Sequence, residues 1–367
     1  MVKPAPIARG STSVEAAGSA ASVPAAPPSP PSPVASIWPI VRTGAAVPQT
    51  PRDKWLPERE PEAIERCAAF VAAPYAVSDA PSQAELGGLA DCDAEALYYG
   101  IGAPVDFELA RKCAFTRAEP NRGAVMGGAE ILMMIYANGQ GVPKNFELAS
   151  RFACTVGGAP AEIDGRLSRL LEARSSGNLG QAMDLCDDIT SGYMSGYCAA
   201  HAERLAAVPR NARKRAATAA MPQAEAKALE SAAERLFDIR STWEVDLTGT
   251  MRARFSIEEQ ATLEDELVVT LEHLRDATFV PPHADPKPLE RELSKLMASI
   301  SQTKDSAETP IGFVTPSGIR KTQRQWLRYR DSLVALVRKV RPAAELDDWR
   351  AAIVQARLEQ LRELWSR

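Results

Sequence analysis

A stretch of twelve residues recurs once in the chain, and this internal repeat restricts the fold more than any other feature. The segment Tyr99–Ala110 is echoed by Asn138–Ala149, so Phe107 and Phe146 stand 39 residues apart. A period of about 20 to 50 residues is typical of a helical solenoid, in which each unit is one helical hairpin. The sequence therefore predicts helical hairpins across residues 61–182.

The second copy of the repeat shows how such a hairpin would form. Gly139 and Gly141 allow the backbone to turn with positive φ, and Asn145 can cap the helix that follows. The apolar positions fall on the two facing helical surfaces. These positions are Leu132, Met133, Tyr136, Ala149 and Phe152.

The run Tyr136–Val142, with Asn145, Ala149 and Phe152, resembles the Sel-type repeat, a tetratricopeptide-like hairpin. The first copy departs from that pattern, and the changed positions are Leu97, Ala103 and Cys113; Met133 also replaces a small residue. The resemblance implies a protein-interaction scaffold without chemistry of its own. Since three repeats are usually needed for a stable core, we expect disulfides or the following helices to support these two.

Residues 1–60 hold twelve of the 28 prolines, with alanine and serine between them. Proline blocks helix formation, so this segment is predicted to be a disordered, extended linker. No apolar stretch follows Lys3, so it does not read as a secretory signal peptide. We expect that an export signal or an anchor is missing from the given sequence, or that the true start lies upstream.

The rest of the chain is predicted to be helical, since alanine is abundant and aromatic residues make up only 6%. Residues 183–280 are interrupted by Gly192, Gly196 and Pro209, and Ser256 is expected to cap a leucine-rich helix. A proline-rich break at 281–286 precedes a second helical region, residues 285–367. Its expected helices are Leu289–Ile300, Ile319–Val340 and Leu346–Trp365.

Within the second of these helices, polar residues share a face with core residues. Gln323 and Arg330 fall on the side of Trp326, Leu333 and Val337. A buried charge must be paired. The adjacent Asp331 points about 100° away on a helix and is a poor partner. We therefore expect the partner of Arg330 to come from another helix.

The run of residues 323–331, with the preceding Leu293–Leu296 helix, resembles the LprI-like family of lysozyme inhibitors. The stretch Cys186–Cys198, with Trp243 downstream, resembles the start of the same domain type. We interpret residues 183–280 and 285–367 as two LprI-like units, although the second lacks cysteine. The resemblance implies binding in the bacterial envelope and inhibition of a peptidoglycan hydrolase by protein contact.

Six cysteines fall within residues 67–198, and none forms a Cys-x-x-Cys motif. They are Cys67, Cys92, Cys113, Cys154, Cys186 and Cys198. No His-x-x-x-His spacing is present and no cysteine has an obvious base beside it, so neither a metal site nor a catalytic thiol is expected. Free buried thiols in a cytosolic protein and three disulfides in an exported one remain as interpretations. The even count and the proline-rich lead favour disulfides.

Several pairings are open. Cys92–Cys113 would join the two helices of the first repeat. Cys186–Cys198 requires a helix that starts after Cys186, capped for example by Thr190, because twelve helical residues span about 18 Å. Cys154–Cys186 is the rival pairing.

Charge is unevenly distributed around a net charge of −4, which disfavours a nucleic-acid partner. Residues 51–100 carry ten acids and four bases, whereas residues 321–367 carry eleven bases and six acids. Both regions can simply be solvated helical faces. Alternatively, the acidic half docks a basic protein such as a lysozyme, or the basic end contacts an anionic polymer or lipid.

A few residues in the C-terminal half could bind a partner or act as catalytic groups, although each also has a structural interpretation. Trp326, Tyr329 and Arg330 are residue types found in interface hot spots, but a core role for Trp326 and a paired structural role for Arg330 are favoured. Phe313, in the loop Thr309–Gly318, could enter a glycosidase cleft. The acid pairs at 187–188 and 347–348 suit helix caps better than a glycosidase site. No phosphate loop, dinucleotide fingerprint or serine elbow is present.

The sequence thus predicts an all-α protein, with helical-hairpin repeats followed by antiparallel bundle units. No apolar run reaches the length of a membrane span. We expect a non-enzymatic, cofactor-free protein that is periplasmic or secreted and binds a protein partner. A repeat scaffold that inhibits nothing, and a cytosolic adaptor with free thiols, are the alternatives.

Overall fold

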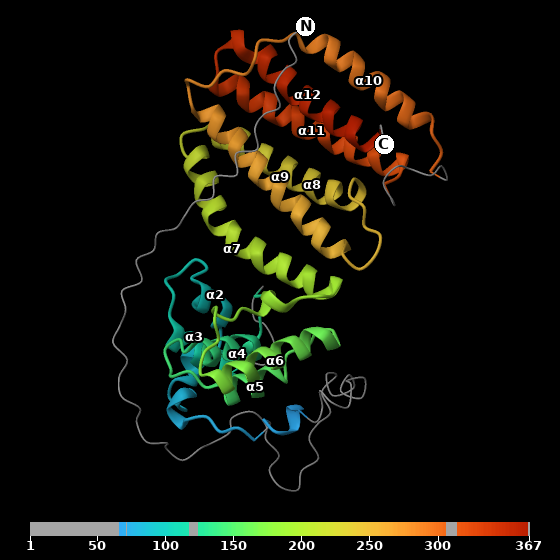
Figure 1. Cartoon of the computed structure of the whole chain (residues 1–367). Coiled ribbons are helices and arrows are strands. Elements are labelled where there is room, and N and C mark those ends of the chain that lie inside the picture. The colour runs from blue at the N-terminus through green and yellow to red at the C-terminus, as the bar shows by residue number, and fades with distance from the viewer. Residues whose placement is uncertain (1–65, 71, 117–123, 306–313, 366–367) are drawn as a thin grey trace. The chain divides into compact units, whose positions relative to one another are not determined.

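The computed structural model describes residues 66–70, 72–116, 124–305 and 314–365, and it confirms the all-α fold class. Helices and turns make up these ranges, and no strand occurs within them (Figure 1). The predicted linker at residues 1–60 lies outside the described residues. Among the described helices, none has the length and apolar character required to cross a membrane.

The N-terminal region is built from short helices joined by tight turns (Figure 1). Its elements are η2 (Val77–Asp79), η3 (Leu86–Leu89), α2 (Ala94–Tyr99), α3 (Phe107–Thr116), α4 (Gly128–Asn138), α5 (Phe146–Ala153) and α6 (Pro160–Ser176). Helices α2 and α3 form one hairpin, and α4 and α5 form the next. Both fall within the predicted repeat region.

The two hairpins repeat the same local geometry at a distance of 39 residues. The C-caps Gly100 and Gly139 adopt φ values of 77° and 71°, which a side chain would strain. The helix that follows each turn is capped by a side-chain oxygen at 2.9 Å, from Asp106 in the first repeat and from Asn145 in the second. The predicted cap at Asn145 is confirmed, and the degenerate first copy keeps it as an aspartate.

The second hairpin packs directly on the first. Phe115 of α3 packs edge-to-face against Phe152 of α5, with ring centres 5.9 Å apart. The Arg111 guanidinium reaches from α3 to the carbonyl oxygens of Gly141 and Asp79, at 3.1 and 3.0 Å. Through Arg111, the first repeat therefore holds the turn of the second repeat and also the chain segment at Asp79, which precedes the first repeat.

Longer helices form the rest of the chain (Figure 1). They are α7 (Gly192–Thr218), α8 (Gln223–Trp243), α9 (Arg252–Arg275), α10 (Pro286–Gln302), α11 (Pro316–Val340) and α12 (Leu346–Trp365). Two short 3-10 helices, η4 (Leu185–Asp188) and η5 (Ala343–Glu345), precede α7 and α12. Three expected boundaries are wrong: Ser256 lies inside α9, and Gly196 and Pro209 lie inside α7.

Buried apolar side chains form two cores, and α7 contributes to both. The first core draws on residues 67–194 and the second on residues 217–361. The change from one core to the other therefore occurs within α7, not at residue 183. The predicted division at 280–285 does not separate two cores, because the helices on both sides of it share the second core.

Helices α7 and α9 lie side by side and run in the same direction. Gly192 faces the start of α9 at Thr250, Gly196 faces Ala253, and the ion pair Arg213–Glu272 follows further along at 2.7 Å. A Cβ atom built on Gly196 would lie 2.8 Å from the Ala253 Cβ atom. The missing side chain thus permits the close approach of the two helices.

The polar face predicted on α11 is only partly buried. Gln323 accepts a hydrogen bond of 2.9 Å from Arg357 of α12. The Arg357 guanidinium in turn binds both carboxylate oxygens of Glu244 at 2.7 Å. The expectation for Arg330 is wrong: it pairs with Asp331 at 2.7 Å near the surface, since a long side chain can bend toward solvent.

Replacing a helical glycine by alanine should have opposite effects on stability inside and outside the contact between α7 and α9. Gly196→Ala should lower the free energy of unfolding by about 1–3 kcal/mol, because its methyl group meets Ala253. Gly165→Ala on α6 is the matched control, since its nearest neighbour would lie 3.7 Å away. It should be more stable by about 0.5–1 kcal/mol. Urea unfolding with the disulfides intact measures both, and equal stabilisation would contradict the close contact.

Candidate functional site

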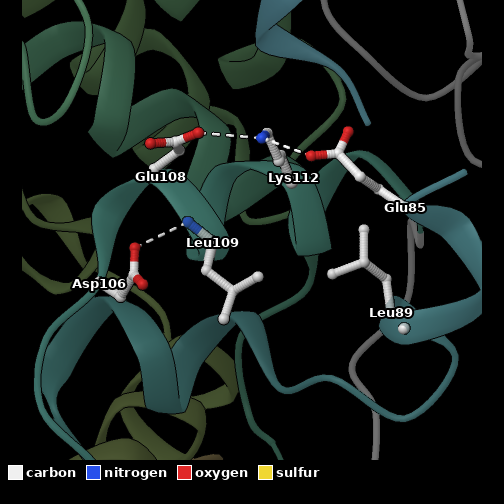
Figure 2. A pocket seen from close by; sticks show the side chains of 7 residues that line it. Glu85, Leu89, Asp106, Glu108, Leu109 and Lys112 are labelled. Atoms are coloured by element: carbon white, nitrogen blue, oxygen red, sulfur yellow. Dashed lines mark hydrogen bonds and ion pairs between the residues drawn. The ribbon is translucent and has the colours of Figure 1, made fainter. Parts of the chain in front are cut away.

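A groove of about 340 Å³ opens on the first repeat (Figure 2). Seven residues from η3, from the turn before α3 and from α3 itself line it. They are Glu85, Gly88, Leu89, Asp106, Glu108, Leu109 and Lys112. Its two walls come from segments that are separate in sequence, so the fold of the first repeat creates the groove.

Local structure fixes each wall. Asp106 is held at the N-terminus of α3, where its carboxylate accepts the Leu109 N–H. Glu85 is held by Ser82, which donates its backbone N–H and its hydroxyl at 2.7 Å. The Cys92–Cys113 disulfide joins the segment that follows η3 to α3. This covalent bond ties the two walls of the groove together.

The groove carries more negative than positive charge. The Lys112 ammonium lies between Glu85 and Glu108, at 2.7 and 2.9 Å from their carboxylate oxygens. The hydrogen bond from Lys112, and then those from Ser82, lower the pKa of Glu85 to about 2. Asp106 adds a third carboxylate to the rim. With one ammonium against three carboxylates, the rim suits a positively charged group.

Apolar surface lies between these charges. Leu89 is almost fully buried and forms the floor, whereas Leu109 is 38% exposed. The neighbouring Leu86 is 39% exposed. A Cβ atom built on Gly88 would meet no atom within 4 Å, so open space adjoins the floor. An occupant could bury apolar atoms here while its cation reaches the rim.

The lining residues are charged or apolar, apart from one glycine. The seven residues include no histidine, cysteine, serine or threonine that could act as nucleophile or base beside a carboxylate. Across the described residues, no group of three or more His, Cys, Asp or Glu side chains is arranged to hold a metal ion. The arrangement can attract and orient a cationic, partly apolar segment.

A second cavity, of about 350 Å³, lies among α7, α8 and α9. Its cations are neutralised locally: Arg210 pairs with Glu203, and Lys214 pairs with Glu264 at 3.6 Å. Phe237 is buried beneath them. Two further acids, Glu234 and Asp238, line this cavity, so its net charge is as negative as that of the groove. Its one large apolar side chain is buried, so it offers a partner less apolar surface than the groove on the first repeat.

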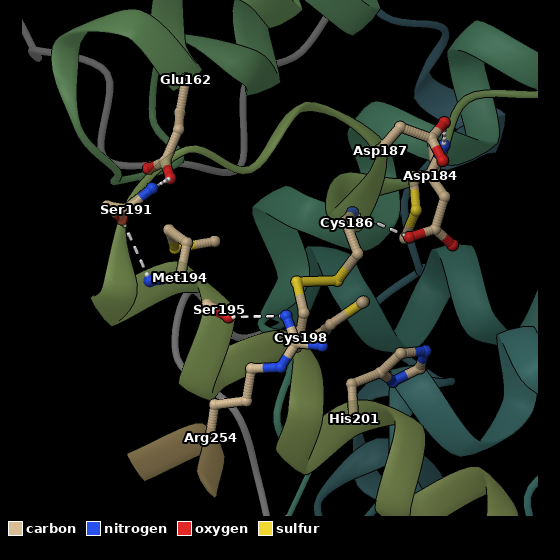
Figure 3. The surroundings of a disulfide bond; sticks show 12 residues. Glu162, Asp184, Cys186, Asp187, Ser191, Met194, Ser195, Cys198, His201 and Arg254 are labelled. Carbon is tan, nitrogen blue, oxygen red and sulfur yellow. Dashed lines mark hydrogen bonds between the residues drawn. A yellow bond between two sulfur atoms is a disulfide. The ribbon is translucent and has the colours of Figure 1, made fainter. Parts of the chain in front are cut away.

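All six cysteines are paired in the structure. The bonds are Cys67–Cys154, Cys92–Cys113 and Cys186–Cys198. The rival pairing Cys154–Cys186 is therefore wrong. As required for Cys186–Cys198, α7 begins after Cys186, but its cap is Ser191 and not Thr190 (Figure 3).

The structure places three of the predicted binding anchors in the second core or beside it. Trp326 is buried in the second core, with the Arg330 guanidinium 5.5 Å from its ring centre. Tyr329 is partly buried and packs near Phe237. Phe313 lies outside the described residues. The core role favoured for Trp326 and the paired role favoured for Arg330 agree with these positions.

Sequence reasoning missed the groove, although it noted the acid surplus that contributes to it. Glu85 belongs to the acidic stretch 51–100, and Glu108 lies on the repeated motif. Glu85 and Glu108 come close together because of the turn after η3 and the Cys92–Cys113 disulfide. The charge pattern of the sequence predicts neither of these features. The Cys92–Cys113 pairing was the one available indication that the two segments lie together.

A buried cluster of charged residues connects α2 to α7. Glu95 is fully buried, and its carboxylate contacts His201 Nδ1 at 2.5 Å and accepts the Val125 N–H at 2.6 Å. Arg204 binds both Glu95 and Asp93. Burial alone would raise the pKa of Glu95, but the bonds from His201 and Val125 and the charge of Arg204 hold it below its usual value.

Comparison with known proteins found no matching family model, no matching curated protein and no matching solved structure.

The Glu95 cluster predicts a pH-dependent loss of stability. Because the pKa of Glu95 is lower in the folded state, its contribution is complete above the unfolded value of 4.5 and declines as the pH falls below it. Glu95→Gln should cost about 3 kcal/mol at pH 7, since Arg204 loses its buried partner. The cost should shrink toward pH 3. Urea unfolding at both pH values tests this, and a pH-independent cost would contradict it.

Proposed function

We propose that this chain is a non-catalytic binding protein of an oxidising compartment, and that the groove on its first repeat receives a basic protein. The observation that carries the proposal is the groove itself, which combines exposed leucine surface with a net negative rim. Helical repeat proteins commonly bind their partners through surfaces of this kind.

Electrostatics support a basic partner. A negative rim raises the local concentration of a cationic protein and speeds its encounter. Hydrogen bonds from Lys112 and Ser82 lower the pKa of Glu85 to about 2, so Glu85 is charged at neutral pH. The exposed side chain of Leu109 then supplies apolar contact area that does not depend on salt. Charge would thus govern the association rate, and the leucines would govern the lifetime of the complex.

The resemblance to lysozyme inhibitors suggests which basic protein this is. We propose a peptidoglycan hydrolase as the partner, which places the protein in the periplasm or outside the cell. The three disulfides suit such an oxidising location. The two stretches that resemble the LprI-like family each contribute to a long helix. Cys198 lies on α7, and Trp326 lies on α11.

A repeat scaffold that binds an envelope component without inhibiting it is the second candidate. It is favoured by two of the predicted anchors, Trp326 and Tyr329, which pack against the second core. Both candidates use the groove, so a binding test comes first and an inhibition assay then separates them. An inhibitor lowers lysozyme activity in proportion to the complex formed, whereas a scaffold leaves it unchanged.

Filling the groove should abolish binding without unfolding the protein. Gly88→Phe places an aromatic ring where the backbone leaves open space, and lysozyme affinity should fall at least about tenfold. Gly87→Phe is the matched control, because Gly87 also has open space but does not line the groove. Calorimetric titration measures both, and equal affinities would exclude the groove as the binding site.

The repeat itself offers a charge control for the same titration. Glu108 in the groove and Glu147 in the second repeat occupy equivalent positions, and each forms an ion pair, with Lys112 and Arg174 respectively. Glu108→Gln should weaken lysozyme binding about three- to fivefold, the effect of one rim charge. Glu147→Gln should leave it unchanged. Equal losses from both variants would indicate attraction by net charge alone.

The oxidising compartment predicts the state of the cysteines. Protein exported to the periplasm and denatured without reductant should show no titratable thiol, because all six cysteines are paired. The same protein should show six after reduction. A thiol count with a chromogenic reagent measures this. Six thiols before reduction would favour the cytosolic adaptor.

A further inference from the structure

Positive charge on the C-terminal helices is neutralised on α12 but not on the outer face of α11. Three arginines of α12 each bind an acid from another part of the bundle. These pairs are Arg350–Glu290, Arg357–Glu244 and Arg362–Glu292. The basic surplus noted in residues 321–367 is therefore left mainly on α11.

Three arginines of α11 are exposed: Arg324, Arg328 and Arg338. None of them forms an ion pair with a residue that the structure describes. They point away from the face that buries Trp326 and Leu333, because α-helical residues advance by about 100° each. The three extend over about 21 Å of helix, at a rise of about 1.5 Å per residue.

The surroundings of these arginines leave the positive charge uncompensated. Asp331, the acid on the same stretch of helix, is already bound by Arg330. Leu327 lies between Arg324 and Arg328 and is 37% exposed, whereas Leu333 and Leu336 of the same helix are buried. The outer face therefore combines a line of guanidinium groups with one apolar side chain.

We propose that the outer face of α11 docks on the anionic surface of a phospholipid bilayer. A guanidinium group binds phosphate oxygens bidentately, and basic segments are drawn to anionic lipids. Leu327 can enter the headgroup region between two such contacts. A straight helix presents its cations in a line, so an extended flat surface meets all three at once.

Other anionic partners fit this face less well. A small anion would contact one arginine at a time, and neither cavity described above involves α11. This inference rests on α11 alone and does not depend on the proposed partner of the groove.

Sedimentation of the full, disulfide-bonded chain with lipid vesicles tests the proposal. Vesicles of phosphatidylcholine with phosphatidylglycerol should bind the protein, and vesicles of phosphatidylcholine alone should not. Removing the three arginines as R324Q/R328Q/R338Q should weaken binding about 100-fold, at about fivefold for each cation. Leu327→Asn should weaken it by less than about tenfold without changing the charge.

A matched variant on α10 separates a defined surface from a net-charge effect. Lys287, Arg291 and Lys295 are exposed and stand four residues apart, so K287Q/R291Q/K295Q removes the same three charges. It should weaken vesicle binding less than about fivefold. Equal losses from both triple variants, or no binding to anionic vesicles, would overturn the proposal. Tight arginine-dependent binding of polyglutamate would overturn the lipid assignment.

Discussion

A carboxylate sealed from water determines where helix α7 can lie. Glu95 is fully buried and has two partners, His201 and Arg204, on successive turns of α7. An unpaired buried charge costs several kcal/mol. If α7 slid or rotated away from α2, the buried Glu95 carboxylate would lose its partners and the fold would carry that cost. Since α7 continues into the second core at Ala217, this one charge cluster sets the path by which the repeats join the helices that follow.

Two hairpins alone make a short solenoid, and the structure shows what completes it. Arginines hold the preceding segment, as Arg111 binds the Asp79 carbonyl and Arg151 the Ala73 carbonyl. On the other side, the buried carboxylate of Glu162 accepts the N–H groups of Thr190 and Ser191 at the start of α7 (Figure 3). The Cys186–Cys198 bond secures the same turn. Because the chain has only two repeats, we expect disulfides or the following helices to support them. The structure contains both kinds of support.

Local signals predicted the hairpins well, because a glycine turn and a capping Asn145 act within a few residues of each other. The buried charge pairs could not be predicted, since Glu95 and His201 are 106 residues apart and Glu244 and Arg357 are 113 apart. Helix geometry correctly placed Gln323 on the inner face. It misjudged Arg330, because a long side chain can carry its charge from the core edge to solvent. The groove escaped prediction for a related reason: its walls meet only through tertiary folding.

The groove and its disulfide connect the cellular environment to binding. Cys92–Cys113 joins the two walls, and the backbone N–H of Cys92 bonds the carbonyl of Leu89 on the floor at 3.3 Å. A receptor surface held in its bound shape loses less entropy on association, so oxidation should favour the partner as well as the fold. In a reducing compartment the walls would be linked mainly by Lys112, an exposed contact that salt weakens. The bond that stabilises the degenerate first repeat thus also preorganises the surface proposed to bind.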